Sequence, residues 1–253
     1  MKIKIFDNKW HKINFNKLSI KLSLFKLANL DFYNKFYKEF FFRYNSFEDL
    51  SLEWKKNKLQ VTKILEKTLP KNINVLSYGC GIGFIEKHLV ENRRDLNLNC
   101  FDFSDVASTW LRRDFKHIYF TADHEKLKKY DFIFMVGLLY AMNDLEIIHL
   151  LKKIMPLLKD KGKILTIDTS SEESENGIEI QNPLLSNFIK NIKNLIRPLY
   201  YFFFKKKEMQ FWGYERNKES YDSIFEKAGL TNYRSFCGNK QLIQIFEVKK
   251  NNI

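Results

Sequence analysis

Three glycines at alternating positions are the residues of this chain that point most directly to chemistry. Gly79, Gly81 and Gly83 follow a short apolar run at residues 74–78 and precede a helix-like stretch. Glycine permits a tight turn and lets a ligand lie against bare backbone, and the start of the following helix adds free N–H groups. The spacing predicts a turn that binds a nucleotide or a nucleoside, with a plain strand-to-helix connection as the structural alternative.

The same spacing narrows the class of ligand. Dinucleotide sites have the pattern G-x-G-x-x-G, whereas Phe84 stands here at the position of the third glycine. The phosphate-binding pattern G-x-x-x-x-G-K-[ST] does not occur, and the turn itself contains no arginine or lysine. These features favour a nucleoside ligand without a pyrophosphate.

Acidic residues follow the next two apolar runs. Asp102 lies about twenty residues beyond the glycines, where a carboxylate accepts hydrogen bonds from both ribose hydroxyls. Its alternative role is the N-cap of the next helix. Asp123 follows the third run, in a position to accept from an adenine amino group, and His124 beside it is either a general base or a packing residue.

Short apolar runs alternate with helix-like stretches from residue 74 onward, which predicts crossover connections and a parallel sheet. We expect strands at residues 74–78, 96–101, 117–121, 131–136, 163–167, 232–236 and 241–248. We expect helices at residues 82–90, 105–113, 145–158 and 218–228.

Two regions stand outside this alternation. Residues 1–71 are expected to form a helical lid or cap, with helices near 27–44 and 53–68; the aromatic residues of 27–44 suit either an ordinary core or an active-site lid. Residues 170–217 are expected to form a substrate-cap insertion. Within it, the basic amphipathic segment 184–207 suits either a cap helix or a helix on a membrane surface.

The motifs, taken in order, resemble the class I S-adenosylmethionine (AdoMet)-dependent methyltransferases. The matching pieces are V-L-x-x-G-C-G-x-G at 75–83, F-D-F-S at 101–104, A-D at 122–123, Y-D-x-I at 130–133, L-L-K-x-x-G-x-I-L at 157–165 and F-E-K-A-G-L at 225–230. The resemblance covers about 74–168 and 218–248. It implies a Rossmann-like α/β domain at 72–250, with a seven-stranded sheet whose last strand is antiparallel, N-terminal helices and a helical insertion after the fifth strand.

The resemblance also implies that AdoMet is the cofactor and that the chain is a methyltransferase. The glycines would approach the methionyl part, Asp102 would hold the ribose, and Phe103 would stack near adenine. The implied cofactor-binding residues are Gly79, Cys80, Gly81, Gly83, Asp102, Phe103, Asp123, His124, Val136 and Gly137. The sequence departs from the family at Ser77, where an acid usually helps to orient the charged methionyl group.

The acceptor is predicted less directly. No Asn/Asp-Pro-Pro-Tyr/Phe segment follows the fourth strand, which speaks against enzymes that methylate amino groups of nucleic acids. Overall similarity to methyltransferases of polysaccharide gene clusters suggests O-methylation of a sugar, sugar nucleotide or surface-glycan precursor. Alternatives are a lipophilic substrate at a membrane surface and a non-catalytic binding module of the same fold. Candidate catalytic residues are His124, Tyr140 and Asp168, and candidate substrate-binding residues are Tyr214 and Arg216.

Bulk composition sets the remaining expectations. The net charge of +13 fits an anionic small-molecule substrate or surface, while abundant Lys, Asn, Ile and Phe together are typical of AT-rich coding sequence, so nucleic acid is not expected as a partner. Three scattered cysteines argue against a disulfide framework and a metal site, and fit a cytoplasmic protein. The first 20 residues show no secretory signal. The oligomeric state is left open.

Overall fold

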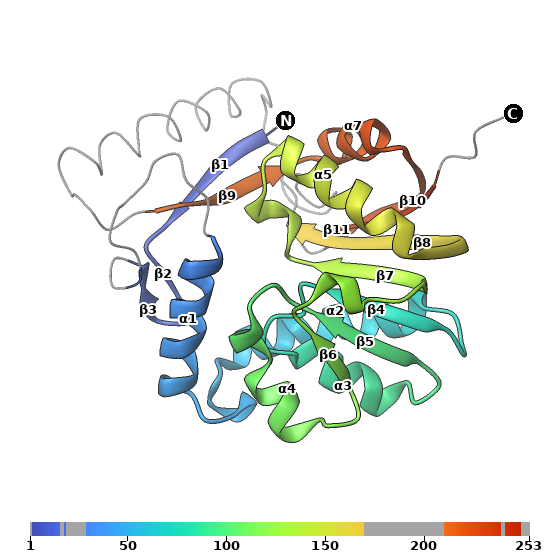
Figure 1. Ribbon diagram of the computed structural model, residues 1–253. Coiled ribbons are helices and arrows are strands. Elements are labelled where there is room, and N and C mark those ends of the chain that lie inside the picture. Colours follow the sequence, from blue (N-terminus) through green and yellow to red (C-terminus); the bar gives the residue numbers. More distant parts are fainter. Residues whose placement is uncertain (1, 16–17, 19–28, 170–209, 239–240, 249–253) are drawn as a thin grey trace, which may run out of the picture.

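A mixed seven-stranded sheet forms the centre of the computed structural model, which describes residues 2–15, 18, 29–169, 210–238 and 241–248 (Figure 1). The strand order is β10-β11-β8-β7-β4-β5-β6. The strands are β4 (Asn74–Tyr78), β5 (Asn97–Phe101), β6 (Tyr119–Thr121), β7 (Tyr130–Val136), β8 (Leu158–Thr169), β10 (Leu230–Gly238) and β11 (Gln241–Val248). Neighbours from β8 to β6 pair in parallel, and β11 pairs antiparallel with both β8 and β10. The predicted fold class, including the antiparallel last strand, is confirmed.

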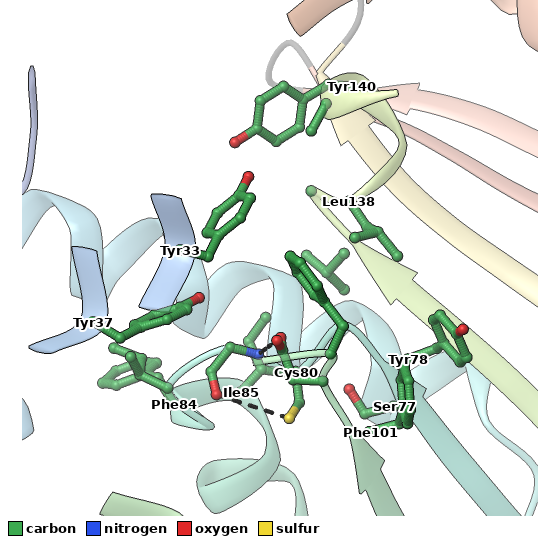
Figure 2. Close-up of a pocket in the computed structure, with 18 of the residues that line it drawn as sticks. Tyr33, Tyr37, Ser77, Tyr78, Cys80, Phe84, Ile85, Phe101, Leu138 and Tyr140 are labelled. Atoms are coloured by element: carbon green, nitrogen blue, oxygen red, sulfur yellow. Dashed lines mark hydrogen bonds between the residues drawn. The ribbon is translucent and has the colours of Figure 1, made fainter. Parts of the chain in front are cut away.

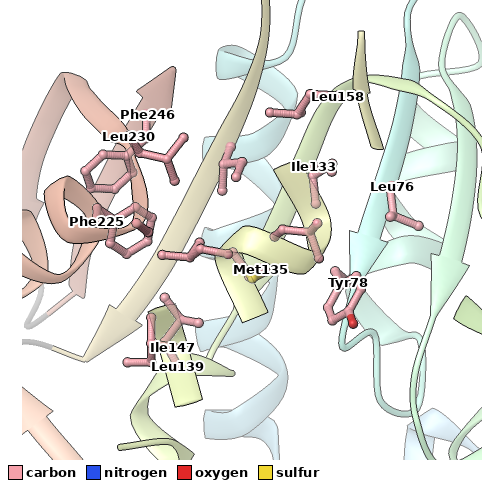
Figure 3. Packing of buried hydrophobic residues seen from close by; sticks show 14 of the residues in the cluster. Leu76, Tyr78, Ile133, Met135, Leu139, Ile147, Leu158, Phe225, Leu230 and Phe246 are labelled. Atoms are coloured by element: carbon pink, nitrogen blue, oxygen red, sulfur yellow. The ribbon is translucent and has the colours of Figure 1, made fainter. Parts of the chain in front are cut away.

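Helices cover both faces of the sheet. The helices are α2 (Leu52–Thr68), α3 (Phe84–Asn92), α4 (Thr109–Asp114), α5 (Asp144–Ile154) and α7 (Lys218–Ala228). Because successive strand residues point to opposite faces, Val75 packs in a core cluster with α2, α3 and α4, whereas Leu76 packs in a cluster with α5 and α7. Figure 3 shows the second cluster, in which Ile147 of α5 and Phe225 of α7 lie near Met135 of β7.

The position of the crevice follows from the strand order. The chain runs from β4 outward through β5 to β6, and then crosses back to β7 on the other side of β4. At such a switch point the loops after the two central strands diverge, and ligands bind outside the carboxyl ends of the strands. Single 3-10 turns follow three of these strand ends: η3 (Asp105–Ser108), η4 (His124–Lys126) and η5 (Leu139–Ala141). Two more lie elsewhere, η2 (Phe47–Asp49) between α1 and α2, and η6 (Met155–Leu157) between α5 and β8.

The N-terminal region is only partly helical. The expected helix at 27–44 is present as α1 (Leu30–Arg43), but the chain before it forms β1 (Lys2–Asp7) and a hairpin of β2 (Lys9–Trp10) and β3 (Ile13–Asn14). β1 pairs antiparallel with β9 (Gln210–Arg216), which is the end of the expected helical insertion. The strands within residues 2–14 therefore correct the expectation of a wholly helical N-terminal region, whereas the helix expected in the insertion was placed at 184–207 and β9 does not test it. The alternation Lys2-Ile3-Lys4-Ile5 has the period of two that strands require. The rest of the insertion, 170–209, lies outside the described residues, as does the amphipathic segment 184–207.

An aromatic cluster joins this N-terminal region to the sheet domain. Trp10 stacks on Phe36 of α1 with ring centroids 4.6 Å apart, and Phe15 stacks on Trp212 of β9 at 4.7 Å. Ser104, just after β5, donates a hydrogen bond of 2.7 Å to the side-chain oxygen of Asn34 in α1. α1 is therefore held over the carboxyl end of β5, beside the crevice.

Candidate active site

A cavity of about 730 Å³ lies at the carboxyl ends of β4, β5 and β7, a size typical of ligand sites (Figure 2). Its floor is the glycine turn and its walls come from the hairpin, α1, α2, η5 and α5. Aromatic residues from these elements include Trp10, Tyr33, Phe36, Tyr37, Phe40, Trp54 and Tyr140. Several α1 aromatics are thus both buried core and cavity wall, and the lid expected for residues 27–44 stays a prediction.

The glycine turn is fixed by the neighbouring strand. The N–H groups of Gly79 and Cys80 donate to the Phe101 carbonyl at 2.7 and 3.1 Å, and the N–H of Gly81 donates to Asp102 Oδ2 at 2.9 Å. Gly81 has φ of 56°, and a Cβ there would lie 3.2 Å from the Tyr37 hydroxyl. The bare backbone therefore leaves room that a side chain would fill.

Gly83, the third predicted glycine, does not line this cavity. It has φ of 80° and stands at the N-cap of α3, where a Cβ would lie 2.2 Å from Cγ of Leu111 in α4. Its geometry serves close packing of helix against helix, and its predicted contact with the cofactor stays a prediction.

Asp102 lies buried at the edge of the cavity. Its two carboxylate oxygens accept hydrogen bonds from the N–H groups of Gly81 and Ser104, each at 2.9 Å. Burial raises the pKa of Asp102 to about 6, and these two hydrogen bonds oppose the rise. Ser104, rather than Asp102, stands at the N-cap of η3. Each oxygen of Asp102 keeps a further lone pair for a ligand hydroxyl.

The other predicted adenosine contacts divide into two groups. Phe103, Val136 and Gly137 line the cavity, and the Phe103 ring lies 5.3 Å from the Tyr33 ring in an edge-to-face arrangement. Asp123 is exposed, caps η4 by accepting from the Glu125 N–H, and does not line the cavity.

The three candidate catalytic residues lie at different depths. Tyr140 lines the cavity, and its hydroxyl faces that of Tyr33 (Figure 2). His124 lies behind the cavity against Tyr78 and Phe101, and its Nε2 is buried without a partner among the described residues. Burial lowers the pKa of His124 and raises that of Tyr140. Only Tyr140 is placed to contact a ligand in this cavity directly.

Asp168, the third candidate, is buried at the end of β8 and does not line the cavity. Burial raises the pKa of Asp168 to about 7. This rise is opposed by the nearby backbone N–H groups of Tyr140 and Leu139 and by the charge of Arg216. Among the described residues, neither carboxylate oxygen has a donor at hydrogen-bond distance and angle. The carboxylate therefore lies directly behind Tyr140.

Arg216 is fully buried and supports the same loop. Its guanidinium bonds to Asp144 at 2.8 Å and to the carbonyls of Met142 and Leu139 at 2.7 and 3.3 Å. It therefore holds η5, the turn that carries Tyr140. Neither Arg216 nor Tyr214 lines the cavity, and their predicted contacts with substrate stay predictions.

Sequence reasoning missed a buried acid in this site. Glu86, in the first turn of α3, lines the cavity, and its Oε1 accepts a hydrogen bond of 2.5 Å from the Ser77 hydroxyl. Its Oε2 is buried without a partner among the described residues. An acid in a first helical turn is usual on electrostatic grounds, so nothing in the sequence distinguished Glu86 from a surface residue.

We expect Glu86→Gln to change how stability depends on pH. Burial raises the pKa of Glu86 from 4.5 to about 7, so between these pH values the folded state holds a proton that the unfolded chain has lost. The free energy of unfolding of the parent should therefore fall by ~3 kcal/mol across this window, with no contribution below it and the full loss above it. Urea unfolding at a series of pH values measures this, and parallel curves for parent and variant would contradict it.

The described part of the chain offers no group of three or more His, Cys, Asp or Glu residues that could hold a metal ion. Within the same residues, no helix combines the length and apolar character needed to cross a membrane.

A parallel sheet with an antiparallel last strand, a glycine turn after its first core strand and an acid after the next define a Rossmann-like domain of the methyltransferase type. A family model described as a methyltransferase domain matches residues 48–235, and the chain belongs to that family. The resemblance seen in the sequence is confirmed. No curated protein matches this sequence significantly.

Several solved structures share the fold. Human N-acetylserotonin methyltransferase in complex with SAM (AdoMet) has a TM-score of 0.56 and 19% identity, over 88% of this chain and 57% of that chain. Mitomycin 7-O-methyltransferase has a TM-score of 0.54 and 16% identity, over 76% of this chain and 54% of that chain. An O-methyltransferase from neocarzinostatin biosynthesis was solved in complex with SAM and 2-hydroxy-5-methyl naphthoic acid. It has a TM-score of 0.53 and 13% identity, over 76% of this chain and 56% of that chain. At these identities the likeness shows the fold alone, and the chain spans little more than half the length of each.

Proposed function

We propose that this protein is an AdoMet-dependent methyltransferase that acts on a hydroxyl group of a small molecule. The observation that carries the proposal is the buried carboxylate of Asp102, bonded to the N–H of Gly81 at the floor of the cavity. A carboxylate one strand away from a bare glycine turn is what a ribose diol requires. The family match and the SAM complexes of the human and neocarzinostatin enzymes support the same cofactor.

The residues present fit AdoMet at this place. The glycine turn gives close backbone approach, Asp102 would hold the ribose, and Phe103 would lie against adenine. When bound, AdoMet supplies a methyl group on a sulfonium that leaves as a neutral thioether. The protein therefore needs mainly to position the acceptor and to exclude water.

The cavity walls bear on the acceptor. Trp10, Tyr33, Phe36 and Tyr140 present rings toward the same space, which favours an acceptor with a flat apolar face, such as a hydroxylated aromatic acid. The naphthoic acid bound to the neocarzinostatin enzyme is of this type. The sugar, sugar nucleotide or surface-glycan precursor expected from the sequence is the second candidate, because such rings also stack on the apolar face of a sugar.

Tyr140 is the residue we assign to the acceptor. Its hydroxyl would donate a hydrogen bond to the acceptor oxygen. Since burial raises its pKa, Tyr140 stays protonated and would orient the acceptor rather than deprotonate it. Arg216 and Asp168 act behind it as positioning residues of η5, through the Leu139 carbonyl and the adjacent backbone N–H groups.

Calorimetric titration tests the proposal. We expect one AdoMet, or one S-adenosylhomocysteine, to bind per chain, with Kd in the range of roughly 1 µM to 1 mM that is usual for enzyme ligands. A panel of hydroxylated aromatic acids and sugar nucleotides with methyl-labelled AdoMet then identifies the acceptor class. A folded protein that binds neither ligand would contradict the proposal, and binding without any turnover would favour the non-catalytic module.

A further inference from the structure

Two charged side chains of the cavity, Glu86 and Lys58, take no part in the proposed adenosine contacts. Glu86 extends from α3 and Lys58 from α2, so they reach the cavity from different elements. Burying charge costs free energy unless a partner offsets it. Two such groups at one cavity therefore indicate a charged ligand group nearby.

Glu86 has one oxygen engaged and one open. The Ser77 hydroxyl donates to Oε1 at 2.5 Å, which orients the carboxylate, while Oε2 is buried and has no hydrogen-bond partner within the described residues. Buried carboxylate oxygens are rarely left unsatisfied. The missing partner is thus a donor that arrives with the ligand, and a cationic donor matches the acid best.

Lys58 is the complementary group. It is half-buried, its Nζ lies 5.8 Å from the Trp54 ring centroid, and among the described residues no carboxylate lies within 4 Å of it. Burial lowers the pKa of Lys58, and the charges of Glu86 and Asp168 oppose that shift. Glu86 and Lys58 are therefore close enough for their charges to interact and too far apart to form an ion pair. The cavity leaves space between these two opposite charges.

The geometry points to a subsite for a zwitterionic amino-acid group, in which Glu86 accepts hydrogen bonds from the ammonium and Lys58 binds the carboxylate. The inference rests on the proposed function, since the methionyl end of AdoMet carries both charges. Ser77 stands where an acid is usual in the family, and here its hydroxyl holds the acid of the next helix in place. The acid beside the glycine turn is therefore on α3, and residue 77 of β4 is a serine.

Binding of three nucleosides to three proteins tests the subsite. The probes are AdoMet, decarboxylated AdoMet, which keeps the sulfonium and the ammonium but lacks the carboxylate, and 5′-methylthioadenosine, a neutral thioether without the amino-acid group. We expect Glu86→Gln to raise the Kd of AdoMet and of decarboxylated AdoMet by roughly tenfold to a hundredfold, because a charge-assisted hydrogen bond is lost. The Kd of 5′-methylthioadenosine should change by no more than about twofold. Lys58→Gln should weaken the binding of AdoMet alone, because only AdoMet carries the carboxylate.

Matched controls lie on the same helices. Glu91→Gln on α3 and Lys56→Gln on α2 replace exposed residues away from the cavity and should leave all three Kd values unchanged. The subsite is overturned if Glu86→Gln binds AdoMet like the parent, or if it loses 5′-methylthioadenosine equally. If the parent binds all three probes with the same Kd, the amino-acid charges make no contribution, which removes the subsite and keeps the nucleoside site. If the parent binds none of the probes, the proposed function itself is overturned.

Discussion

Replacing Asp102 by alanine is expected to weaken S-adenosylhomocysteine binding by about 1–3 kcal/mol, a roughly five- to 150-fold rise in Kd. The change removes the acceptor proposed for the ribose hydroxyls and also leaves the N–H groups of Gly81 and Ser104 without their partner. Both effects act on the ligand site, because Gly81 forms its floor. Calorimetry of the folded variant measures the loss.

A comparison of nucleosides separates these two effects. The parent should prefer 5′-methylthioadenosine over its 2′-deoxy analogue, and Asp102→Ala should lose that preference, since the acid that reads the hydroxyl is gone. Asp105→Ala is the matched control. Asp105 lies three residues after Asp102, and its carboxylate pairs with Arg112 on the surface. An Asp102→Ala variant that keeps the ribose preference would show that the carboxylate shapes the turn and does not contact the sugar.

Replacing Gly83 by alanine is expected to destabilise the fold by ~3 kcal/mol. Alanine at φ of 80° costs about 1–2 kcal/mol in backbone strain. Its Cβ would also lie 2.2 Å from Cγ of Leu111, which is only 1% exposed, so the core must shift at a further cost of ~1–3 kcal/mol. Urea denaturation of parent and variant measures the difference.

Gly229 provides the control for this change. It caps α7 with φ of 95°, and a Cβ there would meet nothing within 4 Å. Gly229→Ala should therefore cost only the backbone part, ~1–2 kcal/mol. Truncating Leu111 to alanine should also make Gly83→Ala less costly than it is in the parent. Equal losses at the two glycines would contradict the role given to helix packing.

Local patterns predicted the sheet domain well because its strands are short, apolar and bounded by turns. The strand at 74–78 was predicted with the bounds of β4, and the strand at 241–248 with those of β11. β8 is longer than expected, since its pairing with β7 begins at Leu158 across a register shift near Tyr130 that apolar periodicity does not reveal. The glycine turn and Asp102 were found because their chemistry depends on residue type and spacing.

Features made by distant parts of the chain were not predicted. β1 forms by pairing Lys2 with Arg216, and a pattern of lysine and isoleucine gives no indication of a partner that far away. The network of Arg216 with Asp144 was not predicted either, because the surroundings of Arg216 depend on where η5 lies. Glu86 and Lys58 look like helix-surface residues until α2 and α3 are placed around the cavity.

A crystal structure of the protein with S-adenosylhomocysteine would show directly whether the cavity is an adenosine site. We expect the adenosine to lie over the turn at Gly79 and Gly81, with both ribose hydroxyls within hydrogen-bond distance of Asp102 and the homocysteine end directed toward Glu86. A nucleoside bound elsewhere, or a ribose that makes no contact with Asp102, would contradict it.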